Sequence, residues 1–190
     1  MALIGANELK RKMLITVDGQ PFTVAEVFFA SPTARGAATM VRTRLRNLLT
    51  GAVLEKSFRS SEKFEEPDVQ LAPASFLYAD ADGFHFMDEA TYEQFMLPAE
   101  SIGDDRGYLK EGVGMQILKY NGEAVSIQLP QFVELVVTYT EPGLSGNTAA
   151  GGASKPARLE TGLEVRVPLF IKEGETVRVN TQTGEVAGRA

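Results

Sequence analysis

Period-two alternation of apolar and polar residues, broken by turn dipeptides that contain glycine, constrains the fold of this chain more than any other feature. Segments 13–17 and 22–29 alternate in this way, and Asp18-Gly19 lies between them. Asp-Gly accepts the positive φ angles that tight hairpin turns require. The same chemistry recurs at Asp82-Gly83, Asn121-Gly122 and Thr183-Gly184. Because side chains along a strand point alternately to opposite faces, this pattern predicts half-buried strands throughout.

Few segments have any helical character. Only residues 89–96 and the stretch near 102–109 could hold short helices, so we expect an all-β fold. Strands that recur every 8–12 residues indicate small barrels or sandwiches. Further strand-like segments are 39–49, 75–80, 84–87, 115–120, 124–129, 133–139, 163–171 and 176–180.

Composition excludes several classes of protein. The 190 residues are 44% hydrophobic and 23% charged, as in globular proteins, and there is no cysteine for disulfides or thiolate metal sites. No apolar run approaches the roughly 20 residues of a membrane span, and the first residues lack the apolar core of a signal peptide. We therefore expect a cytoplasmic protein without membrane contacts.

Charge is distributed unevenly along the chain. Residues 1–63 contain ten Lys or Arg against five Asp or Glu, whereas residues 64–190 contain nine against twenty. A basic module on an acidic body suggests that only one end of the chain meets a polyanion such as nucleic acid. A solvated charge fluctuation is the alternative interpretation.

Two breaks divide the chain into modules. The polar segment 59–69 contains Pro67 and coincides with the change from basic to acidic composition, and a weaker break falls at 128–132. We therefore predict three modules of about 60 residues. Their ranges are 1–65, 66–130 and 131–190.

A row of arginines is the first candidate functional feature. In segment 39–49, Arg42, Arg44 and Arg46 fall on one face of the expected strand, about 7 Å apart from the rise per residue. Phosphates along an RNA backbone have similar spacing, and guanidinium groups suit them. The same row could also be a solvated strand face.

Two loops are further candidates. Arg35 is the only charge in the turn 31–39, where its small neighbours keep the loop slim enough to carry it into a narrow cavity. Segment 141–157 is rich in Gly, Ala, Ser and Thr, which predicts a long loop of the kind that often binds partners.

Catalytic motifs are weak. His85 is the only histidine and there is no cysteine, so the sequence has few of the ligands that a zinc site needs and a single candidate base for a Ser-His triad. Acidic residues at 80, 82, 88 and 89 flank a hairpin and have the composition of turns. We therefore predict no active site, no metal and no cofactor.

Ordered motifs along the whole chain resemble the elongation factor P family, and more closely its elongation-factor-P-like branch. They include Lys155, Ala157, Gly162, Val165, Val167, Pro168, Ile171 and Gly174 in the family's order, and the segments "LLTG" (48–51), "EKSF" (55–58), "GFHFMDEATYEQF" (83–95), "LPQFVELVVTYTEPGLSGNTAAGG" (129–152) and "TGLEVRVPLFIKEGE" (161–175).

This resemblance implies an SH3-like (KOW-like) N-terminal barrel and two OB-like barrels in an L-shaped, tRNA-like arrangement. It also implies a monomeric translation elongation factor that binds both ribosomal subunits, ribosomal RNA and peptidyl-tRNA. Such a factor promotes peptide-bond formation at stalling sequences such as consecutive prolines, while the ribosome performs the chemistry.

The resemblance also assigns residues to roles. The tip near the peptidyl-transferase centre would be Pro32, Thr33, Ala34, Arg35 and Gly36. Contacts with RNA backbone would come from Arg42, Arg44, Arg46 and Lys56. The loop that faces the small subunit would contain Gly146, Asn147 and Thr148.

Two departures from the family pattern affect these assignments. The main branch carries a modified lysine in a Pro-Gly-Lys-Gly tip, whereas this chain has Arg35 in a longer tip, so we predict an unmodified Arg35. Asn147 replaces the usual Asp of the last module's loop, which would lessen repulsion from RNA.

A general single-stranded RNA-binding protein with OB-like barrels is the alternative function. Such proteins stack bases on exposed aromatic side chains beside basic grooves. The aromatic residues at 76, 78, 84 and 86 lie in the acidic part of the chain, so we interpret them as core.

Overall fold

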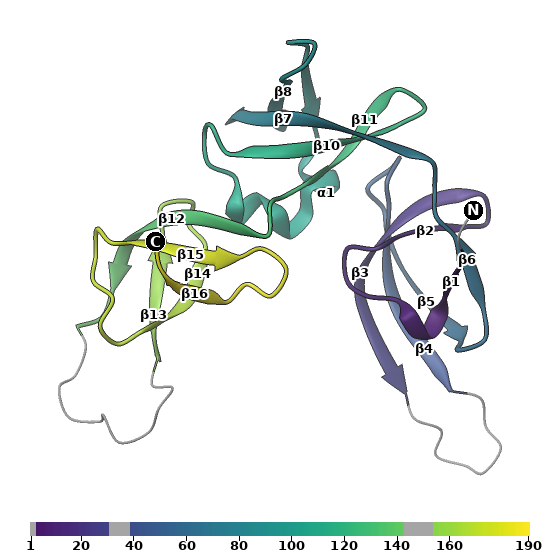
Figure 1. The fold of residues 1–190 in the computed structure, drawn as a ribbon, viewed down its shortest axis with the longest axis horizontal. Coiled ribbons are helices and arrows are strands. Elements are labelled where there is room, and N and C mark those ends of the chain that lie inside the picture. The colour runs from purple at the N-terminus through teal and green to yellow at the C-terminus, as the bar shows by residue number, and fades with distance from the viewer. Residues whose placement is uncertain (1–2, 31–38, 143–153) are drawn as a thin grey trace. The chain divides into compact units, whose positions relative to one another are not determined.

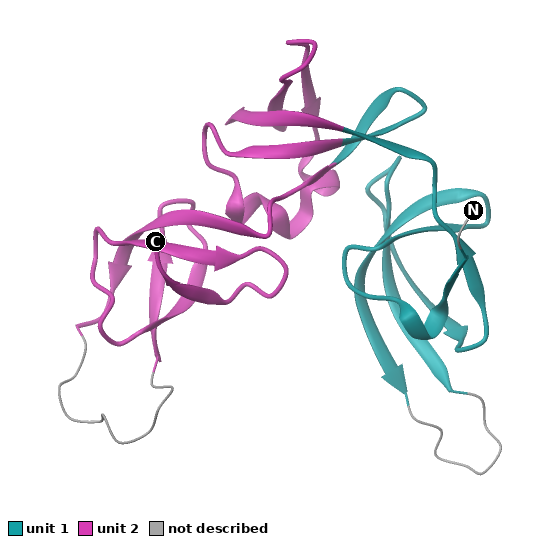
Figure 2. Cartoon of the chain, viewed as in Figure 1, with its two compact units in different colours: residues 1–71, 118–126 teal, residues 72–117, 127–190 magenta. Residues whose placement is uncertain are grey.

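Strands dominate the structure, a computed structural model that describes residues 3–30, 39–142 and 154–190 (Figure 1). The described residues form four sheets, which confirms the all-β prediction. Contacts divide the chain into two compact units (Figure 2). Unit 1 contains residues 1–71 and 118–126, and unit 2 contains residues 72–117 and 127–190.

Unit 1 is built around a four-stranded sheet in the order β2-β3-β4-β5, with the short pair β1-β6 beside it. Its strands are β1 (Leu3–Gly5), β2 (Leu14–Val17), β3 (Gln20–Ala30), β4 (Met40–Asn47), β5 (Val53–Arg59) and β6 (Lys63–Glu65), and the 3-10 helix η1 spans Ala6–Glu8. Inward side chains such as Ile15, Val41 and Leu45 are fully buried. Burial of each such side chain contributes about 1.5–3 kcal/mol.

The predicted hairpin turns are present. Asp18 and Gly19 have φ angles of 51° and 75°, and Asn121 and Gly122 have 52° and 83°. These angles allow two-residue turns between β2 and β3 and between β10 and β11. The tip of the second hairpin belongs to unit 1, where Leu118 and Val125 pack with buried Leu48.

The middle sheet has five strands in the order β11-β10-β7-β8-β9. Its elements are β7 (Val69–Ala79), β8 (Phe84–Asp88), β9 (Gln94–Leu97), β10 (Gly114–Tyr120) and β11 (Glu123–Gln128), with α1 (Ala99–Ile102) and the 3-10 helix η2 (Gly103–Tyr108) between β9 and β10. Rings of Phe76, Phe86 and Phe95 pack within it, with centroids 5.4–5.6 Å apart between neighbours. The two short helices lie where we predicted one helical stretch.

The other helix prediction, at residues 89–96, is wrong. Asp88 Oδ1 accepts hydrogen bonds from the backbone N–H groups of Ala90 and Thr91, which turns the chain at once. The following residues then pair with β8 as strand β9. Local turn chemistry and strand pairing together outweigh the weak helical pattern.

The last sheet has the order β14-β13-β12-β15-β16. Its strands are β12 (Phe132–Thr140), β13 (Ser154–Leu159), β14 (Glu164–Pro168), β15 (Thr176–Asn180) and β16 (Val186–Arg189). Strand β13 corrects the predicted loop 141–157, because Lys155, Ala157 and Leu159 alternate inward and are buried. The remainder of that predicted loop, 143–153, lies outside the described residues.

Contacts inside unit 2 join η2 and the segment after it to the last sheet and its turns. Thr161 Oγ1 donates a hydrogen bond of 2.6 Å to the carbonyl of Gly107. Lys110 Nζ lies 3.0 Å from Glu160 Oε1, which also accepts the backbone N–H of Val136. No helix in the described ranges is long and apolar enough to cross a membrane.

Candidate nucleic-acid interface

The arginine row lies on the outer face of β4. Exposed and buried side chains alternate along this strand, with Arg42 and Arg44 exposed while Val41, Thr43 and Leu45 are buried. Buried Thr43 donates its hydroxyl to the carbonyl of residue 56 at 2.8 Å, which fastens β4 to β5. The predicted alternation is therefore confirmed, and the arginines face away from the core.

Strand β4 ends at Asn47, whose side chain organises the following turn. Its Oδ1 accepts the backbone N–H groups of Leu49 and Thr50, while its Nδ2 donates to Gln20 Oε1 at 2.6 Å. Gly51, with φ of 71°, completes the turn and its N–H donates to the carbonyl of Asn47. The motif "LLTG" thus begins at the end of the arginine strand and fixes its length.

Neighbouring strands give the arginines different electrostatic environments. Arg44 lies 3.5 Å from Glu26 on β3 and directly opposite Glu55 on β5. Arg42 lies opposite Phe28 and Ser57, and within the described ranges it makes no ion pair. Positive charge on this face is therefore least compensated at Arg42.

Lys56 does not belong to the same face. It pairs with inward-facing Thr43, so its side chain lies on the opposite side of the sheet from the arginines. Its Nζ lies 2.9 Å from Asp18 Oδ2 and 5.7 Å from the centroid of the Phe58 ring. The structure thus separates Lys56 from the row with which the sequence prediction grouped it.

Two residues on the arginine face were missed by the sequence analysis. Arg59 on β5 pairs with Met40, and Phe28 on β3 pairs with Arg42, so both share the outer face. A sequence signal for Arg59 existed, because it directly follows the apolar residue Phe58, which is buried, and adjacent residues of a strand lie on opposite faces. Phe28 could not be assigned to a face from alternation, because the register of β3 shifts between Val24 and Glu26.

The two predicted loop sites lie outside the described residues. Strand β3 ends at Ala30 and β4 begins at Met40, so the described strands lead into and out of the tip segment. Residues left without a structural description include Pro32, Thr33, Ala34, Arg35 and Gly36 of the tip and Gly146, Asn147 and Thr148 of the last module.

His85 takes part in a surface cluster on β7 and β8. Its Nε2 lies 2.9 Å from Asp80 Oδ2, and its ring stacks on Tyr78 with centroids 4.4 Å apart. Burial raises the pKa of the Asp80 carboxyl, but hydrogen bonds from Gly83, Asp82 and His85 outweigh it and lower the pKa below its ordinary value. Asp80 therefore serves the turn, as the sequence indicated.

The aromatic residues of the middle sheet are only partly core. Phe76 and Phe86 are buried, but Tyr78 is 51% exposed, so its interpretation as core is wrong. A register shift between Phe76 and Tyr78 reverses the face on which the following residues lie. Among residues 76, 78, 84 and 86 only Tyr78 is exposed, so these four residues do not form the series of stacking platforms that general single-stranded RNA binding uses.

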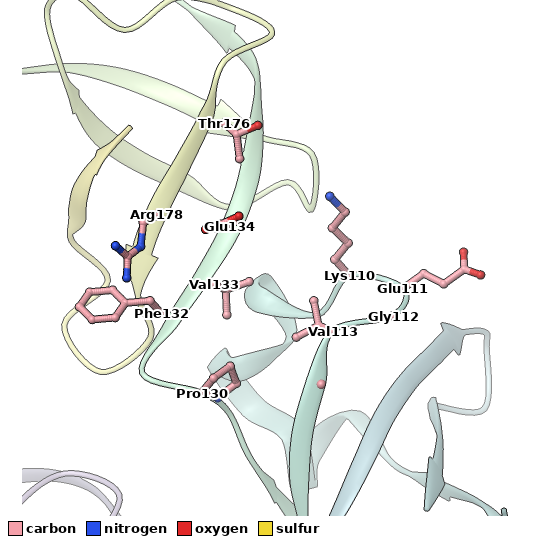
Figure 3. A pocket seen from close by; sticks show the side chains of 11 residues that line it. Lys110, Glu111, Gly112, Val113, Pro130, Phe132, Val133, Glu134, Thr176 and Arg178 are labelled. Atoms are coloured by element: carbon pink, nitrogen blue, oxygen red, sulfur yellow. The ribbon is translucent and has the colours of Figure 1, made fainter. Parts of the chain in front are cut away.

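A pocket of about 610 Å³ in unit 2 is not a convincing ligand site (Figure 3). Both of its basic lining residues already have partners, because Lys110 pairs with Glu160 and Arg178 lies 4.8 Å from the Phe132 ring centroid. The side chains of Lys110 and Arg178 point in different directions in Figure 3. Among the described residues, no group of His, Asp or Glu could hold a metal ion.

The sheets and the arginine face of β4 together define the class of protein: it is a modular all-β protein with a basic N-terminal module. Profiles of one family match successive parts of this chain. They are "Elongation factor P (EF-P) KOW-like domain" at residues 5–64, "Elongation factor P (EF-P) OB domain" at 69–127 and "Elongation factor P, C-terminal" at 133–189.

Full-length relatives carry the same name. Elongation factor P from Thermoanaerobacter sp. (strain X514) is 46% identical over 187 residues, which cover 98% of this chain and 100% of the relative. Elongation factor P from Moorella thermoacetica (strain ATCC 39073 / JCM 9320) is 45% identical over 188 residues, 99% of this chain and 100% of the relative. The chain belongs to the elongation factor P family, whose members are translation factors and not enzymes.

Proposed function

We propose that this chain binds the ribosome beside the peptidyl-tRNA and promotes peptide-bond formation at stalling sequences such as consecutive prolines. Full-length similarity to elongation factor P supports the ribosomal function. The outward arginine face of β4, the strand that follows the tip segment in the chain, is the observation that carries the proposed orientation, in which the first module faces RNA. In this orientation the tip approaches the peptidyl-transferase centre and the cytoplasmic ribosome performs the chemistry.

Three modules divide the work, at residues 1–65, 66–130 and 131–190. The ranges matched by the three family profiles support these boundaries. The basic first module approaches RNA, and the acidic remainder keeps its distance from phosphates except at the loop with Gly146, Asn147 and Thr148, which faces the small subunit. The factor acts as a monomer and needs no cofactor.

We propose that the chain belongs to the elongation-factor-P-like branch, and the tip sequence supports this assignment. Arg35 stands where the main branch has a modified lysine, and the guanidinium is charged without modification. Around it the sequence has only the compact residues Pro32, Thr33, Ala34 and Gly36. Arg35 acts by holding the acceptor end of the tRNA in a productive orientation, because positioning of reactants alone accelerates reactions strongly.

Contacts with the RNA backbone come mainly from the β4 face. Arg42 contributes more than Arg44, because Glu26 and Glu55 flank Arg44, and Arg46 extends the row along the strand. Lys56 contributes least, since it lies on the other face and pairs with Asp18. Such contacts weaken as salt rises, because each phosphate that is neutralised releases counterions.

A reconstituted translation system tests these roles by separating binding from stall relief. Arg35→Ala should leave ribosome affinity within about twofold while it abolishes relief on a consecutive-proline message, because one tip contact contributes little to a salt-dependent affinity spread over several cations. Arg106→Ala removes an exposed positive charge of the central module and should change neither quantity. Loss of binding by Arg35→Ala would contradict the assignment of Arg35 as a positioning residue.

A further inference from the structure

An exposed phenyl ring lies beside the least compensated arginine of the candidate interface. Phe28 is 58% exposed and directly opposite Arg42 in the pairing of β3 with β4. Residues directly opposite in an antiparallel pair have Cβ atoms about 4.5–5.5 Å apart on the same face. The guanidinium and the ring are therefore neighbours that can contact one ligand together.

A β-bulge turns this ring outward. Val24 pairs with Leu45 on the buried face, and strict alternation would place residues 26 and 28 on that face too. The register shift after Val24 instead puts Glu26 opposite Arg44 and Phe28 opposite Arg42, on the outer face. Bulges of this kind redirect side chains at functional surfaces.

The surroundings of Phe28 are apolar and cationic. The next pair along the strands is Ala30 with Met40, which is 38% exposed, and Arg59 pairs with Met40 from the other side. The acids Glu26 and Glu55 lie further back, on either side of Arg44. An apolar ring framed by arginines repels a basic protein segment and suits a ligand that combines a flat ring with a phosphate.

RNA has this combination in its unpaired nucleotides. Unstacked bases lie on aromatic side chains and on guanidinium planes, while Arg also binds the adjoining phosphate. We propose that Phe28 is a stacking platform for an unpaired nucleobase of the tRNA that the factor contacts, and that Arg42 binds a phosphate of the same nucleotide or its neighbour. This inference rests on the proposed function and adds a base contact to the phosphate contacts.

Equilibrium binding to ribosomes tests this proposal. The full-length, fluorescently labelled chain is titrated against ribosomes that hold peptidyl-tRNA in the peptidyl site, and Kd is measured at 50–200 mM KCl. Phe28→Ala should raise Kd about fivefold to 150-fold, as for loss of one base–aromatic stack, with an unchanged dependence of log Kd on log salt. Phe28→Trp should retain affinity, whereas Phe28→Leu should lose most of it. Arg42→Ala should reduce the slope of log Kd against log salt by about 0.7–0.9, because it removes one phosphate contact.

Phe29→Ala is the matched control. Phe29 is 55% exposed on the same strand but pairs with buried Val41, so it lies on the other face. This variant should bind like the unmodified sequence. Circular dichroism and thermal unfolding establish that each variant is folded before binding is measured.

Three results would overturn the stacking proposal while leaving the ribosomal function intact. These are unchanged binding by Phe28→Ala, full retention by Phe28→Leu, and cross-linking of a photoreactive residue at position 28 to a ribosomal protein instead of RNA. Failure of the unmodified chain to bind ribosomes would instead contradict the proposed function itself.

Discussion

Residues of identical type on one strand face differ here through their neighbours. Arg42 and Arg44 share the outer face of β4, yet Arg44 lies between two glutamates while Arg42 lies between Phe28 and Ser57. The Arg44–Glu26 pair is about half exposed on both sides, so it contributes at most about 1 kcal/mol to stability. Its main effect is to reduce the positive potential in the middle of the row.

Glu26→Gln should restore that potential. Removal of the carboxylate frees Arg44 for a phosphate, so ribosome affinity at 50 mM salt should rise about twofold to threefold, with stability changed by less than about 1 kcal/mol. Equilibrium binding at 50 and 200 mM KCl measures the effect, which should shrink at the higher salt. A decrease in affinity would show that Glu26, and not Arg44, contacts the ribosome.

Gly83 shows a different constraint, set by space. A Cβ at this position would lie 2.5 Å from the backbone carbonyl oxygen of Leu97, which cannot move without disturbing β9. Gly83→Ala should therefore destabilise the fold in urea denaturation by about 1–3 kcal/mol from steric overlap, in addition to the backbone strain of a side chain at φ of 158°. Gly122→Ala is the control, because its Cβ meets nothing within 4 Å and costs only backbone strain, about 1–2 kcal/mol. Equal losses would contradict the steric explanation.

At the scale of elements, the hairpins were predictable and the bulges were not. Asp18-Gly19 and Asn121-Gly122 are local signals, because the residues themselves permit the positive φ angles of the turns. A bulge places two residues of one strand opposite a single residue of its partner. Alternation read from one strand alone therefore assigns the wrong face to the residues beyond the bulge. Tyr78 and Phe28 are both exposed for this reason.

In the candidate site, too, some features could be predicted from one strand alone and others depended on the pairing of strands. The alternation of β4 was sufficient to predict that Arg42, Arg44 and Arg46 share a face, because β4 pairs with β5 in continuous register and the bulge opposite it adds its extra residue to β3. The charge compensation by Glu26 and Glu55 could not be predicted, since it depends on the register between strands. The position of Lys56 depended on the same register.

Glu160 illustrates how a single residue joins two elements of unit 2. Burial raises the pKa of its carboxyl, but hydrogen bonds from the Val136 N–H and Lys110 outweigh this and lower it. A lowered pKa means that the ionised form stabilises the fold above the unfolded value of about 4.3, and that this contribution disappears as pH falls through the folded value.

Glu160→Gln should therefore cost about 1 kcal/mol at pH 7, the net value of one hydrogen bond, and progressively less below pH 5. Urea unfolding of both proteins from pH 7 to pH 3 measures the difference. Thr161→Val, which removes the neighbouring bond to Gly107, should cost a similar amount at every pH. A constant penalty for Glu160→Gln across this range would contradict the assigned ionisation.

At the scale of the whole molecule, charge polarity and family membership support the same function. In the proposed function the basic first third approaches RNA, while the acidic remainder resembles RNA in sign. The L-shaped outline implied by the family resemblance stays a prediction. Ribosome binding should depend on salt with a slope near 2 in log Kd against log salt, about 0.7 for each of Arg42, Arg46 and Arg59. A slope near zero would exclude the β4 face as a phosphate-binding surface.

The rate of peptide-bond formation between consecutive prolines tests the proposed function most directly. Rapid-quench kinetics on reconstituted ribosomes, with a proline-ended peptidyl-tRNA and incoming prolyl-tRNA, should show acceleration by the unmodified chain and none by Arg35→Ala at saturating concentration. A phenylalanine acceptor with a readily reacting donor should show little dependence on the chain. An unchanged rate on the proline message, with the chain demonstrably bound, would contradict the proposed function.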